Sequence, residues 1–149
     1  MIALRVLLVL LATAIGASSF ASERFRIGEL RDQHHLDGAG CALQLLMSSR
    51  DVFQWDFEDE AWINLGGRDI RLHLESTGGA NIEDGEGSTG DKEIVRFSGP
   101  DIRVTVTTTI TSECAADDES CEAWTVAAVI SVKTPRRSCS VRTKGLCGS

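Results

Sequence analysis

Strict alternation of apolar and polar side chains is the feature of this sequence that restricts its fold most strongly. Between residues 101 and 112, Ile102, Val104, Val106 and Ile110 share one face, while an arginine and threonines occupy the other. Residues 124–132 repeat the alternation. Successive side chains of a β-strand point to opposite faces, so this period is typical of strands with one buried face. We expect the two segments to pair as a long hairpin.

Shorter segments with strand character lie on either side of this hairpin. They are residues 41–47, 52–57, 61–65, 68–75 and 93–98, with 138–142 as an edge strand at the end. Gly66-Gly67 can supply the positive φ angles of a two-residue hairpin turn. The glycine-rich stretch 78–91 is expected to be an exposed loop. Short strands joined by turns predict an all-β fold, a small antiparallel sandwich or barrel.

The first 21 residues have the layout of a secretory signal peptide. Arg5 gives a positive start, residues 6–15 are almost wholly apolar, and Ser19-Phe20-Ala21 fits the small-x-small cleavage pattern. The apolar run is shorter than the roughly 20 residues that a membrane-spanning helix needs, so we expect no stable membrane anchor. The protein is therefore predicted to be exported, either periplasmic or secreted. After cleavage, we expect residues 22–40 to be a loosely held polar lead-in and residues 41–149 to be a single β domain.

Five cysteines follow the signal, namely Cys41, Cys114, Cys121, Cys139 and Cys147. Disulfides are the default in exported proteins, and the absence of a C-x-x-C pair argues against a zinc ribbon or a thioredoxin-type centre. Cys114 and Cys121 flank the tip of the long hairpin, close enough for a bridge. A Cys41–Cys147 bridge would close a loop of about a hundred residues, worth about 4–5 kcal/mol. Cys139 could replace Cys147, but the preferred scheme leaves Cys139 unpaired.

The chain is acidic, with a net charge of −7 that becomes −8 once Arg5 is removed. Phosphate groups repel such a protein, so nucleic acid and anionic membranes are poor partners. The densest acidic group lies at the hairpin tip and comprises Glu113, Asp117, Asp118, Glu119 and Glu122. Clustered carboxylates on a stapled loop would steer a basic protein partner and lose little entropy on docking. The simpler interpretation is a solvated hairpin end.

Residues 61–74, AWINLGGRDIRLHL, resemble a stretch in a group of small exported bacterial proteins of unassigned function. The resemblance extends to an early cysteine (Cys41), an acidic C-x6-C loop (114–121) and a closing G-x-C-G (145–148), and spans roughly residues 40–148. Cys139 does not belong to the pattern. The resemblance supports the pairs Cys41–Cys147 and Cys114–Cys121. It implies no catalytic residues, because the group has no known activity.

No motif for metal or cofactor binding is convincing. His34-His35 with Cys41 offers soft ligands for copper or zinc, but a solvated histidine pair explains it as well. Residues 81–91 offer oxygen ligands for calcium without the EF-hand spacing. The threonines at 105, 107, 109 and 111 could form a hydroxyl ladder for carbohydrate or ice. One strand does not make a flat array, however, and threonine is ordinary on an exposed strand. We assign no metal and no cofactor.

The sequence also lacks the common catalytic signatures, including G-x-S-x-G, H-E-x-x-H, the P-loop and the dinucleotide fingerprint. We therefore favour an exported non-enzymatic binding module, for example an inhibitor of a basic protein such as a lysozyme. Two alternatives stay open. One is a small cell-envelope hydrolase with an unmarked carboxylate pair; the acidic cluster at 51–60 is itself interpreted as a solvated turn. The other is a purely structural envelope protein.

Overall fold

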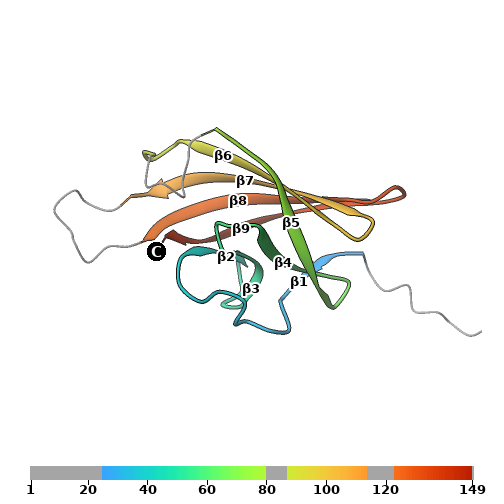
Figure 1. Ribbon diagram of the computed structural model, residues 1–149. Helices are drawn as coiled ribbons and strands as arrows, with labels where there is room; N and C mark the ends of the chain where they lie inside the picture. The colour runs from blue at the N-terminus through green and yellow to red at the C-terminus, as the bar shows by residue number, and fades with distance from the viewer. Residues whose placement is uncertain (1–24, 80–86, 114–122, 149) are drawn as a thin grey trace, which may run out of the picture.

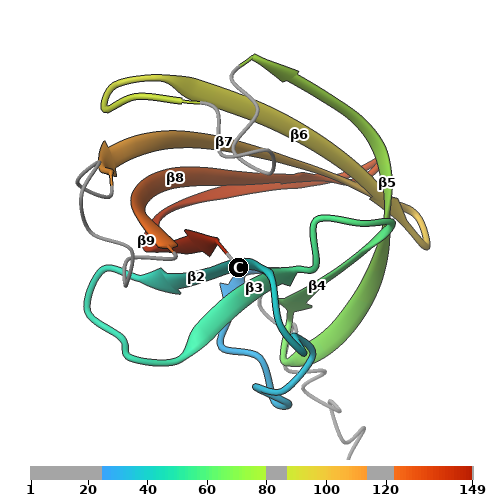
Figure 2. The ribbon, with the colours of Figure 1, turned by 60° about the vertical axis from the view of Figure 1, so that its left-hand side comes forward.

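The chain folds into a closed antiparallel barrel. The computed structural model describes residues 25–79, 87–113 and 123–148, whose regular structure is all β. The strands are β1 (Ile27–Gly28), β2 (Gly40–Leu45), β3 (Asp51–Trp55), β4 (Glu60–Leu65), β5 (Arg68–Gly79), β6 (Lys92–Gly99), β7 (Ile102–Ser112), β8 (Ala123–Lys133) and β9 (Ser138–Gly148). Strands β2 to β9 follow one another as a meander, and β9 returns to pair with β2 (Figures 1 and 2). The expected all-β fold is confirmed, as a barrel of eight strands in the described residues.

The middle of the barrel is filled by side chains. Phe53 and Phe97 are buried and meet edge to face, with ring centroids 5.5 Å apart. Trp55 lies edge-on to Phe97 at 5.5 Å and to Phe57 at 5.1 Å. Aromatic rings favour this geometry, which adds about 1 kcal/mol per pair to the burial of their surface. In the part of the chain that the structure describes there is no helix, and hence none that could cross a membrane.

Strand β9 differs most from expectation. It was expected to be an edge strand over residues 138–142, but it runs to Gly148 and pairs with both β8 and β2. The inward positions of its second half are Thr143, Gly145 and Cys147, of which Thr143 and Cys147 are buried and Gly145 is half-buried. A threonine, a glycine and a cysteine do not produce the apolar alternation that reveals a strand in a sequence. The edge-strand prediction was therefore wrong.

Two further boundaries shift. Strand β5 continues to Gly79, so the first residues of the expected 78–91 loop belong to the sheet. Leu46 and Met47, expected to end the strand that starts at Cys41, instead lie in the turn after β2, where Met47 is fully exposed. Because Leu46 and Met47 are apolar, the strand-like sequence pattern continues for two residues beyond the point where β2 ends.

The seam between β2 and β9 is fixed by a disulfide and by a glycine. Cys41 lies opposite Cys147, and the two form the preferred disulfide across 106 residues of chain. Beside it, a Cβ on Gly145 would overlap the carbonyl oxygen of Ala42 and lie 2.9 Å from its carbonyl carbon. The two strands therefore approach so closely that only glycine fits. The other expected bridge, Cys114–Cys121, lies outside the described residues.

Residues 25–40 form an N-terminal strap across the outer face of β3 and β4. Short strand β1 pairs with the end of β4, beyond the part that pairs with β3. The Leu30 amide donates to the Asp51 carbonyl at 2.7 Å, and the Leu30 side chain is buried. Gln33 and Gln54 exchange hydrogen bonds with the facing backbone. These residues are held more firmly than the loose lead-in that the sequence suggested.

Asp69 is the main anchor of the strap. Its carboxylate accepts the backbone amides of Arg31 and Asp32 at 2.9–3.0 Å and the side-chain amide of Asn64 at 2.7 Å. Nearby, the His35 ring stacks on Trp62 with centroids 4.1 Å apart. Burial alone would raise the pKa of Asp69, but the donated hydrogen bonds and the neighbouring His35 outweigh it, so the pKa lies below its ordinary value.

We expect Gly145→Ala to weaken the seam. The added methyl must push β2 away from β9, so the free energy of unfolding should fall by about 1–3 kcal/mol. Gly78→Ala is the matched control on strand β5, because nothing lies within 4 Å of its added Cβ. That variant should stay within about 1 kcal/mol of the wild type. Urea unfolding of the oxidised proteins, followed by tryptophan fluorescence, would contradict the close-packed seam if both variants behaved alike.

We expect Asp69→Asn to release the strap in a pH-dependent way. The folded pKa of Asp69 is lowered, so its stabilisation is fully present above the unfolded pKa and is lost as pH falls through the folded pKa. The variant should therefore be about 1–3 kcal/mol less stable at neutral pH, with the deficit shrinking between about pH 5 and pH 2. Urea unfolding across this range measures the deficit. Asp59→Asn, at an exposed position in the turn before β4, is the control; a deficit independent of pH would contradict the anchoring role.

Candidate functional site

Three hairpin turns meet at one end of the barrel, because alternate turns of an antiparallel meander lie at the same end. Gly66-Gly67 joins β4 to β5 with φ angles of 62° and 82°, which confirms the expected two-residue turn. Pro100-Asp101 joins β6 to β7. The third turn, residues 134–137, is held by the Thr134 hydroxyl, which accepts two backbone amides at 2.9 and 3.3 Å. These turns and the start of the strap form the barrel mouth.

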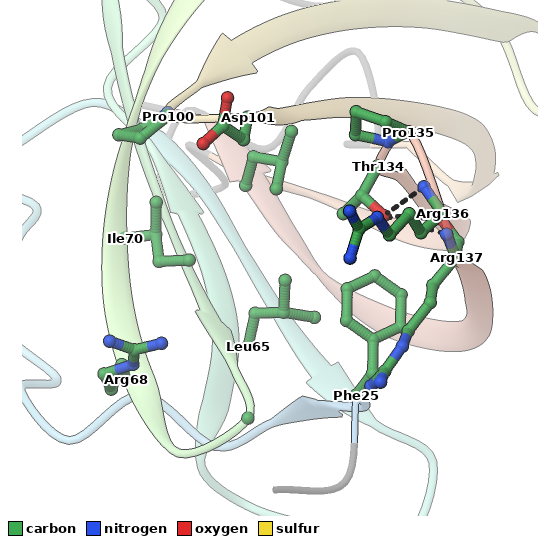
Figure 3. Close-up of a pocket in the computed structure, with 12 residues that line it drawn as sticks. Phe25, Leu65, Arg68, Ile70, Pro100, Asp101, Thr134, Pro135, Arg136 and Arg137 are labelled. Atoms are coloured by element: carbon green, nitrogen blue, oxygen red, sulfur yellow. Dashed lines mark hydrogen bonds between the residues drawn. The ribbon is translucent and has the colours of Figure 1, made fainter.

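The mouth forms an open cavity of about 650 Å³ (Figure 3). Its apolar lining comes from the first strap residue, from inward positions of the strands and from two turn prolines: Phe25, Leu65, Ile70, Ile102, Pro100 and Pro135. In Figure 3, Phe25, Leu65 and Ile70 project into the space between the turns. Cavities of roughly 300–1,000 Å³ with mainly apolar walls are the usual size of small-molecule sites.

The rim of the cavity is cationic. Arg68, Arg136 and Arg137 line it and are exposed. None of the three has an ion pair with another described residue. Asp101 is the one acidic residue in the lining. A guanidinium binds carboxylate, sulfate or phosphate through two parallel hydrogen bonds, so this rim suits an anionic group above an apolar floor.

The floor of the mouth is closed. Ile102 and Leu65 are already buried where they line the cavity, and Val104 and Ile130, further along the barrel, are fully buried. Eight-stranded barrels are narrow enough for side chains to fill them. A ligand would therefore occupy the mouth and would not pass down the barrel.

The structure tests little of the predicted acidic site. Glu113 is exposed just after β7, and its carboxylate accepts the Thr89 amide at 3.2 Å. The other members, Asp117, Asp118, Glu119 and Glu122, lie outside the described residues. The binding role of this group stays a prediction.

The metal-ligand candidates are not brought together where the structure describes them. Cys41 is bonded to Cys147, and His35 stacks on Trp62. Among the described residues there is no group of three histidine, cysteine or acidic side chains that could hold a metal ion. Of the calcium candidates at 81–91, Asp91 lies in the described part and its side chain accepts the Ser88 amide at 3.0 Å.

The acidic cluster at 51–60 has structural roles. Asp51 accepts the side-chain amides of Gln44 and Gln54. Asp56 accepts backbone amides in the turn between β3 and β4, and Glu60 pairs with Arg71 on the neighbouring strand. These contacts give Asp51, Asp56 and Glu60 structural roles.

Cys139 is a free thiol on the inner side of β9. Burial raises its pKa, although a backbone hydrogen bond with Ile27 acts in the opposite direction. The thiolate is the reactive form of cysteine, so this environment does not favour nucleophilic chemistry.

Sequence reasoning did not identify the mouth. Arg68 lies far in the sequence from the Arg136-Arg137 pair, and none of the three belongs to a motif. A signal was available, since a meander places the turns at 66–67, 100–101 and 134–137 at one end; Arg68 directly follows the first of these turns, and Arg136 and Arg137 lie within the third. The contribution of Phe25 could not be seen, because nothing in the sequence predicted where the strap would run.

Comparison with known proteins does not add a relative: no family model, no curated protein and no solved structure matches the chain.

Proposed function

We propose that this protein is an exported, non-enzymatic binding module that takes an amphipathic anion at the barrel mouth. The observation that carries the proposal is the cavity of about 650 Å³ with an apolar floor and a rim of three arginines that form no ion pair with the residues the structure describes. The apolar part of the ligand lies against Phe25, Leu65 and Ile70. Its acidic group meets Arg136 and Arg137 at the edge. Specificity comes from needing both parts at once, since neither a bare anion nor a neutral apolar molecule satisfies the whole cavity.

Export is supported by two features. The first 21 residues have the layout of a signal peptide, and the barrel is closed by a Cys41–Cys147 disulfide, a bond that persists in oxidising compartments. On this proposal the protein works in the periplasm or outside the cell. The predicted basic protein partner would use the acidic group that begins at Glu113, which does not line the mouth, so that prediction is separate from the ligand proposed here.

We expect the mature protein to bind octyl sulfate at the mouth and to bind octanol at least about five-fold more weakly. The difference arises because an exposed charge pair contributes about 1 kcal/mol. Amide shifts in ¹H–¹⁵N spectra should change at Gly66, Arg68, Asp101 and Arg137, which come from the three turns. Titration with both compounds gives the two affinities.

The Arg136→Gln/Arg137→Gln variant should bind octyl sulfate no better than octanol. Arg142→Gln removes one exposed arginine further along β9 and is the control, which should leave both affinities unchanged. Equal affinity of the wild type for the charged and neutral compounds, or amide shifts away from the three turns, would contradict the proposal.

A further inference from the structure

The outer face of strands β6 to β9 forms a regular array of cations and hydroxyl groups. The strands register so that Arg96, Thr105, Ser131 and Ser140 make one row across the sheet. Ser98, Arg103, Lys133 and Ser138 make the next. Neighbouring strands lie about 4.8 Å apart, and rows two residues apart are separated by about 6.8 Å. The single-strand threonine ladder seen in the sequence is thus part of a two-dimensional array.

This face carries positive charge without a matching acid. Six cationic side chains point outward from the four strands: Lys92, Arg96, Arg103, Lys133, Arg142 and Lys144. The one acidic residue in these strands, Glu93, is buried on the inner side. None of the six cations has an ion pair within residues 25–79, 87–113 or 123–148. The net charge of −7 is summed over the whole chain, so it does not reveal that this one face is positive.

Part of the array is hollowed into a groove of about 620 Å³. Arg96, Arg103 and Lys133 line it together with the hydroxyl groups of Thr105, Ser131 and Ser140. Glu75, on the adjoining strand β5, also lines the groove and is its single acidic side chain. Three cations against one carboxylate leave the groove positive, with hydrogen-bonding hydroxyls between the charges.

We propose that this groove binds an acidic polysaccharide. Its sulfate, phosphate or carboxylate groups lie on Arg96, Arg103 and Lys133, and its sugar hydroxyls exchange hydrogen bonds with the neighbouring threonine and serines. Charge complementarity draws the chain to this face, and the spaced rows let successive acidic groups meet successive cations. This site is separate from the mouth, whose ligand needs an apolar floor.

The outer face favours a polysaccharide over other polyanions. Single-stranded nucleic acid needs aromatic side chains on which bases stack, and the outward positions of β6–β9 carry none. A lipid surface would need apolar side chains that enter it. The groove has none pointing outward, and Val129, the nearest exposed large apolar side chain, lies on the row beyond.

The test uses fluorescein-labelled dextran sulfate, with uncharged dextran as its matched probe, and anisotropy at low and moderate salt. The mature protein should bind dextran sulfate but not dextran, with an affinity that falls about ten-fold between roughly 50 and 200 mM salt. The Arg96→Gln/Arg103→Gln/Lys133→Gln variant should bind at least about ten-fold more weakly. Glu75→Gln should bind about two- to three-fold more tightly, a gain that a folding defect cannot produce.

The matched control is Lys92→Gln/Arg142→Gln/Lys144→Gln, which removes the same charge from the same face outside the groove. It should weaken binding by no more than about three-fold. Equal losses in the two triple variants would overturn the site, because net charge alone would then explain binding. Tighter binding of oligo-dT or of phosphatidylglycerol vesicles than of dextran sulfate would overturn the choice of partner. The Arg136→Gln/Arg137→Gln variant should keep its affinity for dextran sulfate, so failure at the groove and failure at the mouth are distinguishable.

Discussion

The pairing of β2 with β9 is the interaction on which the rest of the structure depends. An open sheet would leave two edges of unpaired backbone groups, and this pairing removes both. Forming this contact lowers the conformational entropy of the chain considerably, because Cys41 and Cys147 are separated by 106 residues. The disulfide removes much of that loop-closure entropy from the unfolded chain. Gly145 then allows the strands to meet at full hydrogen-bonding distance. Without this seam there would be neither a mouth nor a curved outer face.

Closure also links the strap to the mouth. Strand β1 occupies the edge of β4 that β3 leaves free, and this places Phe25 in the cavity wall. On β5, Arg68 lines the mouth while the next residue, Asp69, anchors the strap. The same short segment of backbone therefore sets the positions of an apolar wall and of a rim cation. A displacement of the strap would therefore shift two lining residues of the mouth. Phe25 belongs to the strap itself, and Arg68 is the backbone neighbour of the strap anchor Asp69.

The sequence was sufficient where local pattern determines structure. Alternation located β7 and β8, and the glycine pair at 66–67 located a hairpin turn. It was insufficient where a residue's role depends on a distant partner. The second half of β9 has small or polar inward residues, so only its partners β2 and β8 make it a strand. The arginines of the mouth converge from separate turns, and the outer array needs the register of four strands. Neither is visible until the sheet is assembled.

Net charge does not describe a local surface, for the same reason. The value of −7, from which we expected nucleic acid and anionic membranes to be poor partners, sums charges that lie far apart. Arg103 and Glu113 are separated by ten residues, roughly 33 Å along a strand at about 3.3 Å per residue. At physiological ionic strength the Debye length is about 8 Å, so the carboxylate at one end hardly affects a ligand at the other. What an approaching anion meets is the local set of cations. An acidic protein can therefore carry an uncompensated group of cations in one place while its carboxylates lie elsewhere, and the anion sites proposed above depend on that local separation.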